Sequence, residues 1–137
     1  MYLVELYEFL HDEEIFIRIE AIEALSHVVD ELDIKTVEKE LMPALLKMLT
    51  LGVHDEIDLR FSKIFGRIVF SLVKSELHLK YKEKLFNYYR QLLDHPKEEI
   101  RVNAAYNLPC FNQIYNRRNF NQQKIQLPIQ KPNTATT

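Results

Sequence analysis

Apolar residues recur every three or four positions through most of this chain, which is the spacing of one face of an α-helix. Short breaks rich in acidic residues, proline or glycine interrupt the pattern. The spacing predicts six helices in three consecutive pairs, at about residues 3–10 and 15–29, 36–49 and 57–72, and 81–93 and 97–111. Three similar pairs in succession favour a stack, because a single pair has an apolar face that only its neighbours can cover.

Several residues with special backbone or capping chemistry mark the ends of these elements. Asp12 and Thr36 precede apolar stripes and are expected to cap the helices that follow. Gly52 is expected in a left-handed conformation after a helix. Pro43 falls inside an apolar stripe, where its missing N–H predicts a bent helix. Pro109 is expected to kink or end the last helix for the same reason.

An arginine preceded by a branched apolar residue occurs near the start of each second helix, at Arg18, Arg60 and Arg101. Because their separations are nearly constant, we interpret them as equivalent positions of a repeat. Six residues after the three arginines lie Ala24, Gly66 and Asn107, which are small enough for neighbouring helices to approach closely. The arginines therefore define a predicted register for the three units.

Acidic residues lie in each turn that precedes these arginines. We expect each arginine to bridge to a turn carboxylate of an adjacent unit, with Asp12, Asp55 and Asp94 as the partners. Exposed ion pairs add little stability, so such pairs would mainly fix the angle between units. Lys63 occupies a place where the other units have alanine, and its ammonium group is expected to extend into solvent.

Composition supports a helical, soluble protein. Hydrophobic residues make up 47% of the 137 residues, and only two glycines are present, which favours an all-α class over turn-rich β folds. The formal net charge of −2 argues against a nucleic-acid surface built on bulk charge. The first residues lack the charge pattern of a signal peptide, and no apolar run is long enough to span a membrane. We expect a cytoplasmic protein, with the nucleus as the alternative compartment.

The sequence divides into a helical array and a tail. The array is expected over residues 1–116, with units at about 1–33, 36–74 and 78–116, and residues 117–137 are rich in Asn, Gln, Thr and Pro and are predicted to be disordered. Three units are near the lower limit for a stable array. We therefore expect either a piece of a longer protein or a chain that binds a partner at an open end.

The repeated pattern resembles the HEAT repeat. The resemblance rests on Leu41, Pro43 and Leu45 in a first helix, on the acidic turn, and on the apolar residue and arginine that open each second helix. A further stretch is similar to the HEAT-repeat scaffold and regulatory subunits of type 2A family protein phosphatases, and its matching positions are Arg101, Asn103, Asn107, Leu108, Cys110 and Asn112. The resemblance implies a right-handed α-α superhelix of about three repeats.

The same resemblance implies a non-catalytic scaffold or regulatory subunit whose partner is a serine/threonine phosphatase catalytic subunit, with no cofactor, nucleic acid, membrane or small-molecule substrate. In those scaffolds, the turns within the repeats hold the other subunits. The corresponding exposed residues here are Glu13, Glu14, His54, Asp55, Glu56, Lys97 and Glu98. A generic HEAT adaptor for another assembly is the alternative within binding proteins.

An enzyme on a HEAT fold is the alternative from a different class. His11 with Asp12, His54 with Asp55, and His95 occupy successive turns, but a metal site needs at least three ligands that converge within a few ångströms. Turns of successive helix layers are expected roughly 10 Å apart. Cys110 has no evident base beside it in the sequence. We therefore expect no catalytic residues and no metal site.

Overall fold

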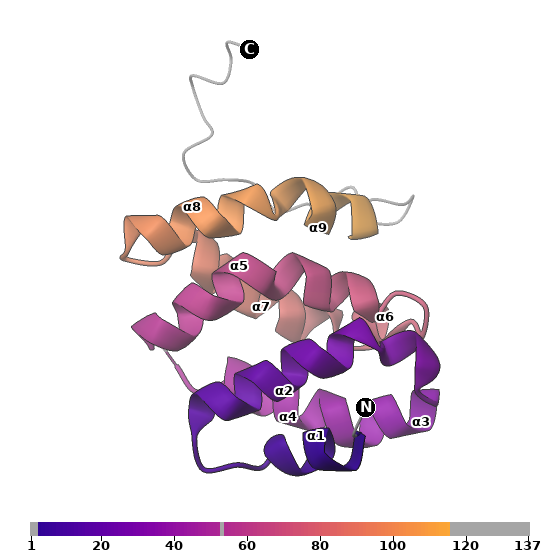
Figure 1. Cartoon of the computed structure of the whole chain (residues 1–137). Helices are drawn as coiled ribbons and strands as arrows, with labels where there is room; N and C mark the ends of the chain where they lie inside the picture. The colour runs from indigo at the N-terminus through magenta and orange to yellow at the C-terminus, as the bar shows by residue number, and fades with distance from the viewer. Residues whose placement is uncertain (1–2, 53, 116–137) are drawn as a thin grey trace.

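The computed structural model describes residues 3–52 and 54–115, and every regular element within them is helical (Figure 1). The all-α class is therefore confirmed for this part of the chain. The tail predicted for residues 117–137 lies outside the described residues. No helix in the described part is long and apolar enough to cross a membrane.

The helices form three successive pairs. The first pair is α1 (Leu3–Phe9) and α2 (Ile15–His27). After a 3-10 turn, η1 (Val29–Glu31), the second pair consists of α3 (Ile34–Thr36), the π-helical segment η2 (Val37–Leu41), α4 (Met42–Leu49) and the long α5 (Asp55–Ser71). The third comprises α6 (Leu77–Lys80), α7 (Lys82–Leu93), α8 (Glu98–Tyr106) and α9 (Leu108–Tyr115).

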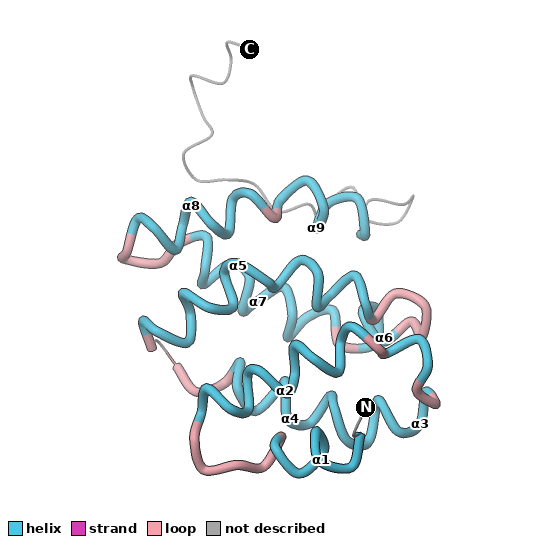
Figure 2. The backbone as a smooth tube through the Cα atoms, viewed as in Figure 1, coloured by secondary structure: helices cyan, strands magenta, loops and turns pink. Residues whose placement is uncertain are grey.

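The second helices of the pairs lie side by side. Helix α5 contacts α2 on one side and both α8 and α9 on the other (Figure 1). The turns within the pairs lie along one edge of the molecule, at the left in Figure 2, and the connections between pairs lie along the opposite edge. Each helix α2, α5 and α8 therefore begins at the same edge.

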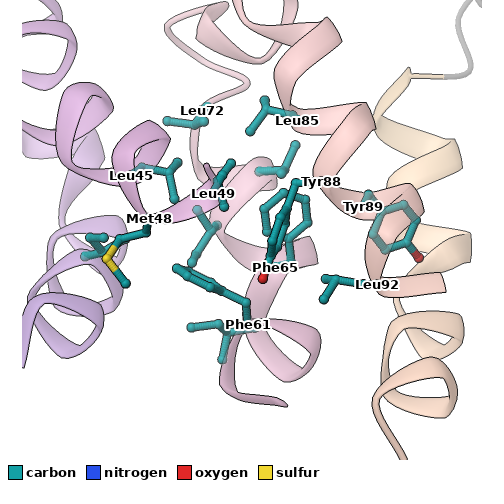
Figure 3. Close-up of a cluster of buried hydrophobic side chains, with 14 of the residues drawn as sticks. Leu45, Met48, Leu49, Phe61, Phe65, Leu72, Leu85, Tyr88, Tyr89 and Leu92 are labelled. Carbon is teal, nitrogen blue, oxygen red and sulfur yellow. The ribbon is translucent and has the colours of Figure 1, made fainter. Parts of the chain in front are cut away.

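The hydrophobic core runs continuously between the helices. Figure 3 shows Leu45 and Met48 of α4 facing Phe61 and Phe65 of α5, with side chains of α7 beyond them. Phe65 is completely buried and packs against three aromatic rings of α7 and α9, with ring centroids 5.4 to 6.0 Å apart. These rings belong to Tyr88, Tyr89 and Phe111. Tyr88, Tyr89 and Phe111 are therefore packing residues, as their spacing indicates.

Pro43, Pro109 and Gly52 each lie close to the end of a helical segment. Pro43 lies in the first turn of α4, directly after the π-helical segment η2, so the regular α-helical hydrogen bonding changes where the proline N–H is missing. Pro109 follows the break between α8 and α9. Gly52 has a φ of +89°, the left-handed conformation expected of it. The prediction that Thr36 caps a helix is wrong, because α3 begins earlier, after Asp33.

The register defined by the arginines is also wrong. It would pair Phe65 with Tyr106, yet Phe65 is fully buried and Tyr106 is 82% exposed. A register two residues longer pairs buried apolar residues of α5 with buried apolar residues of the third pair at four positions: Ile57 with Ile100, Phe61 with Ala104, Phe65 with Leu108, and Ile68 with Phe111. Burial of the apolar face therefore decides the alignment of the units, whereas the apolar-arginine pairs recur at non-equivalent positions.

Candidate partner-binding surface

The seven residues predicted to bind a partner lie at the starts of the three second helices. All seven are exposed, and they line the edge where the turns within pairs meet. This edge is called the ridge below; its residues are Glu13, Glu14, His54, Asp55, Glu56, Lys97 and Glu98. Acidic residues near helix N-termini are stabilised by the helix dipole, which explains why carboxylates prevail there.

The second and third turns of the ridge are in direct contact. Asp55 Oδ2 lies 3.6 Å from Lys97 Nζ, and Asp55 Oδ1 lies 3.6 Å from His95 Nε2. The side chains of Asp55, His95 and Lys97 therefore bridge the space between two successive turns. Both Asp55 and Lys97 remain more than half exposed, so this ion pair contributes little stability and stays available to a partner.

Beneath this contact lies a buried polar network centred on Asp58. Tyr88 Oη donates to Asp58 Oδ1 at 2.6 Å, and the backbone N–H of His54 donates to Asp58 Oδ2 at 3.2 Å. His95 Nε2 lies 3.2 Å from the same Oδ2, while His95 Nδ1 accepts the backbone N–H of Lys97 at 3.0 Å. Because Nδ1 is an acceptor, the proton of a neutral His95 lies on Nε2 and is donated to the carboxylate.

The network joins α5, α7 and the turn before α8. Asp58, Tyr88 and His95 are each at least 95% buried. Burial, and then the hydrogen bond to Asp58, raise the pKa of the Tyr88 hydroxyl, which therefore stays protonated and keeps donating. A buried carboxylate is costly unless donors surround it, and here three donors do so. The network therefore serves to position the two turns of the ridge.

Helix α8 is fixed to α5 by the side-chain amide of Asn107. Its Nδ2 donates to Ser62 O at 2.7 Å, and its Oδ1 accepts the backbone N–H of Gly66 at 3.2 Å. A Cβ atom at position 66 would lie 2.4 Å from Asn107 Oδ1, so the missing side chain of Gly66 is what allows this approach. Asn103 adds a bond from Nδ2 to Ser62 Oγ at 3.2 Å. We call this set the asparagine contact.

Helix α2 is fixed to α5 by charged groups instead. Glu23 accepts from Arg60 Nη2 at 2.9 Å through one carboxylate oxygen and from Arg67 Nη2 at 3.0 Å through the other. His27 Nε2 lies 2.7 Å from Arg67 Nη1 and acts as the acceptor, because a guanidinium group only donates. The side chains of Glu23, Arg60 and Arg67 are 23%, 32% and 44% exposed, respectively.

The three repeat arginines do not bind the aspartates predicted for them. Arg60 does bridge to the neighbouring unit, but through Glu23 in the middle of α2 rather than through a turn residue. Arg101 Nη1 donates to the backbone carbonyls of His95 and Pro96 in its own unit. Arg18 buries its Nε without a hydrogen-bond partner in the described residues. Their different roles agree with their non-equivalent positions in the stack.

Among residues 3–52 and 54–115, no three His, Cys, Asp or Glu side chains converge as metal ligands do. Cys110 is half-buried with Sγ 4.0 Å from Gly66 O, and burial raises the pKa of its thiol, which lowers the thiolate fraction. The hydrogen bonds and ion pairs described above connect neighbouring helices.

Sequence reasoning missed the buried roles of Asp58 and His95. A signal exists for Asp58, because it shares the helical face of Ile57, Phe61 and Phe65, where an ionised residue needs buried donors. His95 carries no such signal, since it lies in a turn.

The fold and the ridge define an all-helical protein of stacked helix pairs with a charged edge. No family model, curated protein or solved structure matches the chain.

Proposed function

We propose that this chain is a HEAT-type α-solenoid that binds other proteins and has no catalytic role of its own. The observation that supports the proposal is the parallel placement of α2, α5 and α8 with their first turns at one edge. Such an arrangement displays turn residues from three units on one continuous surface. Positioning of a bound partner is the mechanism this surface suits.

The partner we propose is a serine/threonine phosphatase catalytic subunit of the type 2A family, on the basis of the sequence resemblance. The ridge contact between Asp55 and Lys97, held from below by Asp58 and His95, gives two neighbouring turns a fixed relative position. A rigid surface loses less conformational entropy on binding than a loose one, so it binds more tightly for the same contacts. The generic HEAT adaptor remains the second candidate within this class.

Affinity purification from a cell extract tests the proposal. Tagged full chain is expected to recover a type 2A family catalytic subunit, identified by mass spectrometry. The double variant Glu56→Lys with Glu98→Lys reverses two exposed ridge charges and should lower recovery at least about tenfold. The matched control is Glu83→Lys, an exposed glutamate in α7 away from the ridge.

The outcomes separate the candidates. Recovery of a different protein that the ridge variant no longer binds would support the generic adaptor and reject the phosphatase. Equal recovery of the phosphatase by the ridge variant and by the control would reject the ridge as the binding surface.

A further inference from the structure

Helix α1 and the turn after it carry negative charge that no cation of the same segment balances. Residues 3–14 contain five carboxylates and no lysine or arginine. Within the described residues, none of the five carboxylates forms an ion pair. Four of them are exposed and the fifth is partly exposed: Glu5, Glu8, Glu13 and Glu14, followed by Asp12.

The segments next to α1 add further negative charge. Residues 3–52 contain twelve carboxylates but only four lysine or arginine residues. Four cations from later in the chain pair with three of these carboxylates, namely Arg60 and Arg67 with Glu23, Lys74 with Asp30, and Lys80 with Glu38. Even when those four cations are counted, carboxylates outnumber cations in this part of the molecule by four. This part of the surface therefore attracts positive charge.

Exposed apolar side chains flank the carboxylates of α1. Val4 is 69% exposed and Phe9 is 43% exposed. Helical spacing places Glu5 and Glu8 between them, on the side of α1 that faces away from the buried Leu10. We call this surface, formed by residues 3–14, the acidic face. It suits a segment that carries both cationic and apolar side chains.

Residues 116–137 have the complementary composition. They lie outside the described residues, and their sequence contains four lysine or arginine residues and no aspartate or glutamate. The same sequence has four large apolar residues, which are Phe120, Ile125, Leu127 and Ile129. Its four positive charges therefore face five negative charges on the acidic face, with no carboxylate side chain of its own to oppose the attraction.

This segment is long enough to reach the acidic face of its own chain. Helix α9 ends at Tyr115 in the third pair and α1 belongs to the first, so two spacings between neighbouring pairs separate them (Figure 1). Each spacing is roughly 8 to 10 Å, whereas 22 residues span up to about 70 Å when extended. Attachment to the same chain also gives a higher effective concentration than a second copy provides.

We propose that residues 116–137 dock on the acidic face of the same chain. The lysine and arginine side chains of the segment pair with the carboxylates, and its apolar side chains cover Val4 and Phe9. Because Glu13 and Glu14 are also ridge residues, the docked segment covers the first turn of the ridge. This inference goes beyond the proposed function and does not depend on it.

Paramagnetic relaxation in NMR spectra of the full chain tests the proposal. Cys110→Ser removes the only cysteine, and Gln130→Cys then carries a nitroxide next to Lys131. A nitroxide broadens the amide signals of residues close to it. We expect the signals of α1, including those of Glu5 and Glu8, to lose most of their intensity at low salt and to recover it in concentrated NaCl.

Charge reversal on α1 should abolish this broadening. The variant is Glu5→Lys with Glu8→Lys, and the matched control is Glu83→Lys with Glu99→Lys, which reverses two exposed glutamates of the third pair. Unchanged signals of the buried residues of α2 report that each variant is folded. Full intensity of the α1 signals in the labelled parent protein, or an equal loss of broadening in the variant and the control, would overturn the proposal.

A mixing experiment distinguishes docking within one chain from docking on a second copy. Isotope-labelled chain without the nitroxide is mixed with nitroxide-bearing chain that has no isotope label. We expect the α1 signals of the mixture to keep full intensity. If they were broadened as strongly as in the doubly labelled chain, the segment would dock on another molecule and the proposal would be wrong.

Discussion

Helix α5 meets its two neighbours through opposite chemistry. Towards α2 it uses partly exposed ion pairs, in which Glu23 binds both Arg60 and Arg67. Towards α8 it uses the neutral asparagine contact, where the amide of Asn107 reaches the backbone of Gly66. Ion pairs in water tolerate changes of geometry and weaken with salt, whereas an amide held against a helix backbone has one geometry. The second contact is therefore the more specific of the two.

The difference extends to what lies around each contact. Beside α8 the rings of Phe65, Tyr89 and Phe111 stack, and the Asp58 network joins the two turns. Beside α2 the hollow lined by His27, Arg67 and Phe70 opens to solvent. We infer that the α5–α8 side supplies rigidity and that the α2–α5 side supplies an accessible, charged surface.

Asp58→Ala should have the largest effect. It would leave the buried donors of His54, Tyr88 and His95 without their acceptor, and His95 cannot reverse its tautomer without losing the bond from Lys97 N–H. We expect a loss of about 2 to 3 kcal/mol in the free energy of unfolding, measured by urea denaturation. The control Asp55→Ala changes a side chain that is 52% exposed and should cost less than about 1 kcal/mol. Equal costs would contradict the network.

Gly66→Ala should cost about 1 to 2 kcal/mol, although alanine is normally the better helix residue by about 1 kcal/mol. The reason is that the new Cβ atom displaces Asn107 Oδ1. In an Asn107→Ala background the same change should stabilise the protein, because the atoms nearest to that Cβ all belong to Asn107. Urea denaturation of the four proteins gives the coupling. Additive effects would show that the two residues are independent.

Alkaline pH should destabilise the protein, and Tyr89 should account for part of the effect. Burial raises the pKa of Tyr88, Tyr89 and Tyr115 above that of an exposed tyrosine. Because the folded pKa is the higher one, the contribution is complete below about pH 10 and is lost as the pH rises further. Tyr89→Phe removes the bond to Ala104 O, at a cost of about 1 kcal/mol at pH 8.

The measurement for Tyr89 is the free energy of unfolding from pH 8 to pH 11. The Tyr89→Phe variant should lose stability less steeply above pH 10 than the parent protein. An unchanged slope would show that Tyr89 ionises as readily in the folded state as in the unfolded state.

Glu23→Gln should have the smallest effect, about 0.5 kcal/mol at low salt and close to none in 1 M NaCl, because its partners are partly exposed to solvent. The control is Glu20→Gln, an exposed glutamate one turn earlier on α2. Thermal denaturation at two salt concentrations distinguishes them. A loss above about 2 kcal/mol, or a loss that salt does not reduce, would place the α2–α5 contact in the same class as the asparagine contact.

The helix pairs could be predicted from the sequence because apolar spacing reports directly on burial. Pro109 and Gly52 also act locally, so their effects were predictable. The register was not, because the apolar-arginine pairs recur by coincidence of spacing while Phe61 and Phe65 are aligned by packing. Contacts across helices, such as Glu23 with Arg60, depend on that register, and the predicted aspartate partners failed with it. The ridge residues were placed correctly at exposed turns, and their role in binding stays a prediction.

Gly66 has a consequence for how the helices can be assembled. It is the only glycine in the helices of the described residues, since Gly52 lies in a turn. Gly66 is therefore the position along α5 where no Cβ atom keeps the amide of Asn107 away from the backbone. If α8 slid by one turn, that amide would meet a side chain in place of backbone. The missing Cβ atom of Gly66 thus determines where along α5 the helix α8 can pack.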